Sequence, residues 1–123
     1  MLKINDKLLI KKVRHANTPW QRIKGLMFED ARKFDYALVF EFPNESRIGC
    51  SIHMMFVFFP IDILFLDKNK KVVDNVTLYP FNPNYTPKKA SKYVIEMPKG
   101  KAAKVKVGSK VSWQLDKKTR AKA

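Results

Sequence analysis

Short apolar runs, rich in β-branched and aromatic residues and bounded by turn residues, recur along most of the chain. Runs of this kind predict β-strands. The turn-forming segment 67–70 predicts a hairpin of 61–66 with 71–78, and Gly108-Ser109 predicts a second one between 105–107 and 111–115. We expect strands over 7–13, 36–42, 52–57, 61–66, 71–78, 93–97, 105–107 and 111–115.

One short helix is expected at Pro19–Lys24. Thr18 can cap it, Pro19 suits its first position, and Gly25 can end it in a left-handed conformation. The charged residues 116–123 predict a disordered basic tail. The fold class is therefore mostly β (β-rich α+β), a single domain over 1–115. Its expected architecture is small, barrel-like or two-layered, with about seven short strands.

Positive charge is concentrated at the two ends of the chain. The net charge is +14, of which residues 1–33 contribute +6, residues 34–98 contribute zero and residues 99–123 contribute +8. Chain ends often lie close together on a domain, and two adjacent excesses would form one positive face. Such a face attracts polyanions and anionic membranes. Alternatively, the charge serves solubility alone.

Other features limit the class of protein. Cys50 is the single cysteine, so no intrachain disulfide can form. Residues 1–10 lack the pattern of a signal peptide, and the apolar run 52–66 is too short to span a membrane. We expect a cytoplasmic protein with no transmembrane segment. Common nucleotide-binding, hydrolase and zinc motifs are absent from the sequence, which therefore gives little support for an enzyme or a cofactor.

Several short motifs follow one another along the chain: Arg22-x-x-Gly25-Leu26-Met27, 38–42, Ile52-His53-Met54, 60–67, 93–98 with Gly100, and Gly108. Their order and spacing resemble the family called domain of unknown function 192. The resemblance implies a compact, mostly β, barrel-like fold with no agreed activity. Where many family members have Phe-Trp-Met followed by Lys-Asn-Thr, this chain has 52–54 followed by Met55-Phe56-Val57, and His53 takes the place of the tryptophan.

Two carboxylates lie within apolar runs. Asp62 and Glu96 would each cost several kcal/mol on burial unless paired or hydrogen-bonded. The family pattern implies Arg22 as the partner of Asp62. The three residues form either a charged pocket that binds a small ligand or performs acid–base chemistry, or a purely structural brace.

A second candidate site combines Cys50 and His53. A thiolate, an imidazole and nearby methionine thioethers are ligands that suit monovalent copper. In a strand, however, His53 and Met54 would face opposite ways. The alternative is a buried cysteine among core methionines.

Nucleic acid is the third candidate partner. Lys104 and Lys106 would share one face of a strand, and Tyr79, Phe81 and Tyr85 are candidate stacking residues. The excess of lysine over arginine favours phosphate contact over base readout. The candidate phosphate-binding residues are Lys99, Lys101, Lys104, Lys106, Lys110, Lys117, Lys118 and Arg120.

Overall fold

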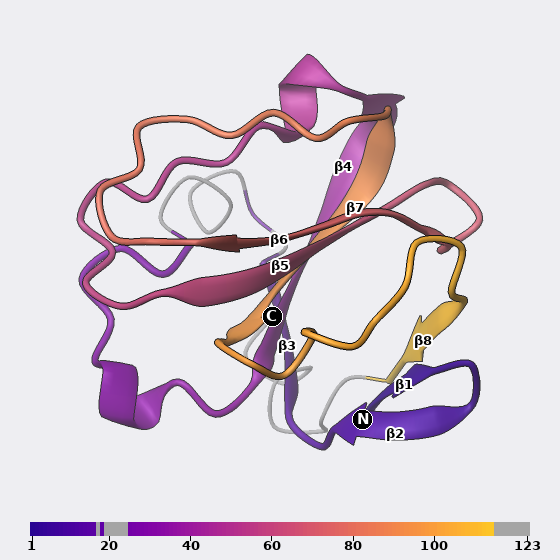
Figure 1. Cartoon of the computed structure of the whole chain (residues 1–123), viewed down its shortest axis with the longest axis horizontal. Coiled ribbons are helices and arrows are strands. Elements are labelled where there is room, and N and C mark those ends of the chain that lie inside the picture. Colours follow the sequence, from indigo (N-terminus) through magenta and orange to yellow (C-terminus); the bar gives the residue numbers. More distant parts are fainter. Residues whose placement is uncertain (17, 19–24, 115–123) are drawn as a thin grey trace.

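Eight strands form two sheets in the computed structural model, which describes residues 1–16, 18 and 25–114 (Figure 1). Two short 3-10 turns, η1 (Ala31–Lys33) and η2 (Ile48–Cys50), accompany them. The strands are β1 (Leu2–Ile4), β2 (Lys7–Ile10), β3 (Val13–Ala16), β4 (Ala37–Ser46), β5 (Ile61–Leu66), β6 (Val72–Leu78), β7 (Ser91–Pro98) and β8 (Val111–Trp113).

The larger sheet has the strand order β3-β4-β7-β5-β6. Its β3–β4 pair is parallel and the other pairs are antiparallel. Every residue of β5 is buried, because both faces of this sheet are covered. The run of apolar residues in β5 reflects that double burial, since a half-exposed strand would alternate.

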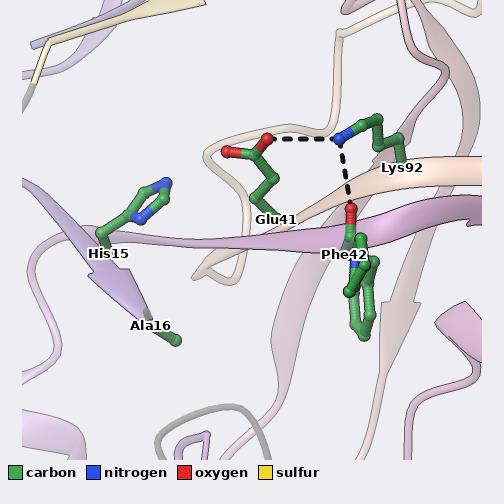
Figure 2. Close-up of a pocket in the computed structure, with 6 residues that line it drawn as sticks. His15, Ala16, Glu41, Phe42 and Lys92 are labelled. Atoms are coloured by element: carbon green, nitrogen blue, oxygen red, sulfur yellow. Dashed lines mark hydrogen bonds and ion pairs between the residues drawn. The ribbon is translucent and has the colours of Figure 1, made fainter. Parts of the chain in front are cut away.

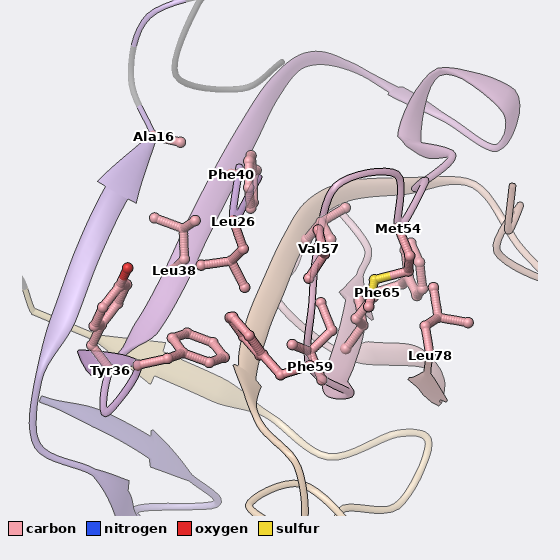
Figure 3. Close-up of a cluster of buried hydrophobic side chains, with 14 of the residues drawn as sticks. Ala16, Leu26, Tyr36, Leu38, Phe40, Met54, Val57, Phe59, Phe65 and Leu78 are labelled. Atoms are coloured by element: carbon pink, nitrogen blue, oxygen red, sulfur yellow. The ribbon is translucent and has the colours of Figure 1, made fainter. Parts of the chain in front are cut away.

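The two faces carry separate cores. Leu38, Phe40 and Ile63 belong to the first core, which loops bearing Leu26 and Met54 cover (Figure 3). The second core, on the other face, contains Val39, Leu64, Ile95 and Met97 of the sheet together with Leu2, Ile10, Ala102 and Val111. The second face is therefore covered by the small sheet and by the segment after β7.

The smaller sheet, of order β2-β1-β8, joins the two ends of the described chain. Leu2 pairs with Trp113 in antiparallel register. The amino terminus of Met1 donates to the carbonyl of Gln114 at 2.7 Å, and the Gln114 amide donates back to the Met1 carbonyl at 2.9 Å. The expected proximity of the chain ends is thus present between residues 1 and 114.

Several predicted elements are confirmed. The hairpin after β5 has its turn at 67–70, where the Asp67 side chain accepts from the amides of Asn69 and Lys71. β7 contains the predicted strand 93–97. Residues 37–42 of the predicted strand 36–42 lie in β4, which continues past Pro43 with an irregular register. Gly25 has a φ of 50°, the left-handed region expected of it. The predicted helix 19–24 and the tail 116–123 lie outside the described residues.

The strand predicted at 52–57 is wrong. This segment makes one isolated bridge, between Ile52 and Tyr85, and then turns. Phe56 has a φ of 59°, which is incompatible with an extended strand. The predicted strand 7–13 is also interrupted, since it separates into β2 and the start of β3.

The second predicted hairpin is wrong as well. Residues 105–107 form no strand: turns lie at 101–104 and 107–108. The Asn75 side-chain amide donates to the carbonyls of Ala102 and Val105 at 2.9 and 2.8 Å. Val107 is 64% exposed, and β8 pairs with β1. Lys104 and Lys106 therefore do not share a strand face. The described strands make two sheets and no closed barrel.

Candidate polyanion-binding surface

The joined chain ends carry a dense set of exposed lysines. Segments 1–12 and 98–114 contain nine lysines, all exposed, and a single acidic residue, Asp6. Lys110 lies at the junction itself, where its amide donates to the Asn5 side chain at 2.9 Å. We call this set the basic surface; its lysines are Lys3, Lys7, Lys11, Lys12, Lys99, Lys101, Lys104, Lys106 and Lys110.

Lysines from both ends meet in one groove. It has a volume of about 530 Å³, and Lys11, Lys12 and Lys101 line it together with Leu8, Leu9, Ile10, Phe34, Asp35 and Pro98. Asp35 pairs with Lys12 at 2.6 Å. Within the described ranges, Lys12 is the only lysine of the basic surface with a carboxylate partner. The remaining ammonium groups are available to an anion.

Five lysines of this surface are candidate phosphate-binding residues from the sequence, and the structure shows all five exposed: Lys99, Lys101, Lys104, Lys106 and Lys110. The sequence analysis assigned no role to the four N-terminal lysines of this surface, although the net charge of +6 over residues 1–33 was a signal for them. Lys117, Lys118 and Arg120 lie outside the described residues.

Asp62 is buried and hydrogen-bonded within the protein. It is 1% exposed, and its carboxylate accepts from the Thr77 hydroxyl at 2.7 Å and from the amides of Gly100 and Ala102 at 2.9 and 3.0 Å. These bonds attach the lysine-bearing segment after β7 to the sheet. All the hydrogen-bond donors to this carboxylate are therefore neutral groups. Two of them are backbone amides of the segment that carries Lys99, Lys101 and Lys104.

Glu96 lies on the opposite face of the sheet. In the strand register it stands beside Leu38 and Ile63 of the first core, whereas Asp62 stands beside Met97 of the second core. Burial raises the pKa of Glu96 to about 8. The structure therefore does not bring Asp62 and Glu96 together in one pocket, and Arg22 lies outside the described residues.

Comparison with known proteins places the chain in a family. Residues 1–113 match the family DUF192, described as "Uncharacterized ACR, COG1430". The chain belongs to the DUF192 family. A UPF0127 protein of Pyrococcus abyssi is 44% identical, with 89% of this chain and 95% of that protein covered. A UPF0127 protein of Pyrococcus horikoshii is 45% identical, with 82% and 86% covered.

Two solved structures share the DUF192 fold. A protein of unknown function from Novosphingobium aromaticivorans superposes with a TM-score of 0.71 at 24% identity, covering 82% of this chain and 74% of that one. A protein from Sinorhizobium meliloti, described as a candidate transcription regulator, gives 0.73 at 22%, covering 81% and 79%. At these identities the likeness establishes the fold alone. No helix within the described residues is long and apolar enough to cross a membrane.

The proposed copper ligands of this DUF192 domain are in different environments. Cys50 is fully buried, its thiol donates to the Ser91 carbonyl at 3.1 Å, and burial raises its pKa to about 11. His53 is exposed, and its Nδ1 accepts from the Met55 amide at 3.2 Å. Among the described residues no three His, Cys, Asp or Glu side chains gather as metal ligands. A buried neutral thiol is a poor metal ligand.

A second depression, of about 230 Å³, lies beside β3 and β4 (Figure 2). Lys92 extends over it and donates to the Glu41 carboxylate and to the Phe42 carbonyl, each at 3.2 Å. The charge of this lysine is therefore already compensated within the protein, which makes this depression a weaker anion site than the groove of the basic surface.

The candidate stacking residues differ in exposure. Tyr79 and Phe81 are 54% and 44% exposed. Tyr85 is structural, because its hydroxyl donates to Asp74 at 2.6 Å and its ring packs on Phe65. Sequence reasoning missed that Phe81 belongs to a larger cluster of exposed rings. One signal was available in the sequence: Met55-Phe56-Val57, which includes a ring of this cluster, replaces the polar Lys-Asn-Thr of many family members.

Proposed function

We propose that this DUF192 domain is a non-catalytic binding module that contacts nucleic acid through its phosphates, without reading sequence. The observation that carries the proposal is the β1–β8 pairing, which brings the two lysine-rich segments side by side. Nine exposed lysines accompany one acidic residue there. A surface of this kind concentrates a polyanion by long-range attraction and by release of its counterions.

The type of cation supports phosphate contact. All nine cations of the basic surface are lysines, which act as flexible point charges and lack the planar fork that arginine uses on guanine. The groove adds a defined place where Lys11 and Lys101 lie on opposite segments of the chain. Both chain segments therefore contribute a lysine to the same groove.

The proposal is tested by fluorescence anisotropy with a labelled single-stranded RNA over a salt series. The triple variant Lys101→Gln/Lys104→Gln/Lys106→Gln is compared with Lys68→Gln/Lys88→Gln/Lys89→Gln, which removes the same charge from exposed positions elsewhere. Each phosphate contact contributes about 0.7 to the slope of log K against log salt. The first variant should lower that slope by about 2, and the second should leave it nearly unchanged.

Two results would contradict the proposal. Equal losses in both triple variants would show that net charge alone attracts the RNA. Binding of the unmodified protein that disappears by about 0.15 M salt, where exposed charges are strongly screened, would assign the lysines to solubility.

A further inference from the structure

Four phenylalanine rings from three loops form an exposed cluster. Phe28 is 66% exposed, Phe58 is 56% exposed, and Phe56 and Phe81 are each 44% exposed. Phe28 stacks on Phe56 with 5.1 Å between ring centroids, and Phe58 meets Phe81 edge-on at 5.4 Å. We call these four residues the phenylalanine cluster. Contiguous exposed apolar groups of this kind mark interaction sites.

The cluster is held in place by its backbone. Phe28, Phe56 and Phe81 have φ values of 62°, 59° and 65°, a left-handed conformation that bulky side chains rarely adopt. The Phe28 amide donates to the Phe56 carbonyl at 2.8 Å, and the Phe81 amide donates to the Met54 carbonyl at 2.9 Å. Strained residues persist when the surrounding structure fixes them, and they concentrate at ligand sites. The rings are thus preorganised.

The phenylalanine cluster adjoins the basic surface. The Lys99 ammonium lies over the ring of Tyr79, 5.4 Å from its centroid. Tyr79 is two residues before Phe81 in the sequence. Lys99 begins the lysine-rich segment that covers the second face of the sheet, whereas the loops of the cluster cover the first face. Aromatic rings and lysines therefore meet around the edge of the large sheet.

We propose that the phenylalanine cluster is a base-stacking platform, and that the nucleic acid bound by this protein is single-stranded. The inference rests on the proposed phosphate contacts and adds the substrate class. One face of the Phe28 ring stacks on Phe56, and a nucleobase placed on its exposed face would extend that stack. Stacking on aromatic side chains tolerates any base, which agrees with binding that does not read sequence.

The arrangement favours a single strand over two other anionic partners. A duplex keeps its bases stacked inside, out of reach of Phe28. A flat anionic membrane would have to contact rings and lysines that lie over opposite faces of the large sheet. A flexible strand can bend around the sheet edge, with its phosphates on the lysines and a base on the rings.

The test compares four ligands: a labelled single-stranded RNA of about 12 nucleotides, its duplex, polyphosphate, and anionic phosphatidylserine vesicles. Phe28→Asn removes the ring while asparagine tolerates the left-handed backbone. Phe28→Tyr retains a stacking ring. Ile48→Asn removes an apolar side chain that is 76% exposed on η2, outside the cluster, and serves as the matched control.

We expect Phe28→Asn to weaken single-strand binding by about 5- to 150-fold, and to leave polyphosphate and duplex binding unchanged. Phe28→Tyr should retain single-strand binding, and Ile48→Asn should have no effect. Equal affinity of single strand and duplex, unaffected by Phe28→Asn, would overturn the stacking platform while leaving the phosphate contacts intact. Failure of every nucleic acid and of polyphosphate to bind would instead remove the proposed function. Loss of vesicle binding alone in Phe28→Asn would assign the cluster to a membrane.

Discussion

Replacing Asp62 with alanine is expected to lower the free energy of unfolding by about 3–5 kcal/mol. The substitution removes the acceptor of the Gly100 and Ala102 amides, both of which lie at the root of the lysine-bearing segment. It also removes the partner of the Thr77 hydroxyl. Buried donors that lose their acceptor cost about 1–3 kcal/mol each. Urea unfolding at neutral pH measures the change.

Asp35→Ala is the matched control for this prediction. Asp35 is an exposed carboxylate with one ion-pair partner, Lys12, so its removal should cost less than about 1 kcal/mol. If Asp62→Ala lowered the free energy of unfolding by no more than Asp35→Ala does, the hydrogen bonds of Asp62 would not stabilise the fold. The case for a ligand-binding carboxylate at that position would then reopen.

Glu96 is expected to make the protein less stable as the pH rises. Its folded-state pKa is raised by burial from 4.5 to about 8, so between these values the folded protein keeps a proton that the unfolded chain has lost. Stability falls with pH wherever the folded state binds more protons. This contribution is fully present below about 4.5, declines by up to about 1.4 kcal/mol per pH unit and levels off above about 8.

The variant Glu96→Gln isolates this contribution. It keeps the shape of the side chain and cannot ionise, so its stability should lack the decline due to Glu96. Urea unfolding of both proteins at several pH values between 5 and 8 gives the difference in their unfolding free energies. Histidine titration contributes equally to both proteins and therefore does not affect this difference. The difference should grow in favour of Glu96→Gln with rising pH. A constant difference would show that Glu96 ionises in the folded protein as easily as in the unfolded chain.

Local signals in the sequence predicted local structure. The hairpin of β5 and β6 follows from two apolar runs and the turn at 67–70, all within 18 consecutive residues. β8 was expected to pair with its immediate neighbour in sequence, but it pairs with β1 at the other end of the chain. Periodicity indicates which side chains are buried and does not specify the partner of a strand.

The sequence likewise predicted some features of the candidate site and not others. Composition located the basic ends, because charge is a property of the sequence itself. The requirement that Asp62 be satisfied was also predictable, but its amide partners lie about 40 residues away and are backbone groups, which no side-chain pattern reveals. The phenylalanine cluster was hidden because exposed rings in left-handed turns have the composition of strand cores.

The most direct test of the joined basic surface is residue-by-residue mapping by NMR. An amide-correlation spectrum of the full chain is followed during titration with single-stranded RNA at about 0.15 M salt, where weak surface attraction is screened. We expect shifts in segments 1–12 and 98–114 together, with further shifts at the phenylalanine cluster. Shifts confined to one chain end, or centred on the Lys92 depression or η2, would contradict this expectation.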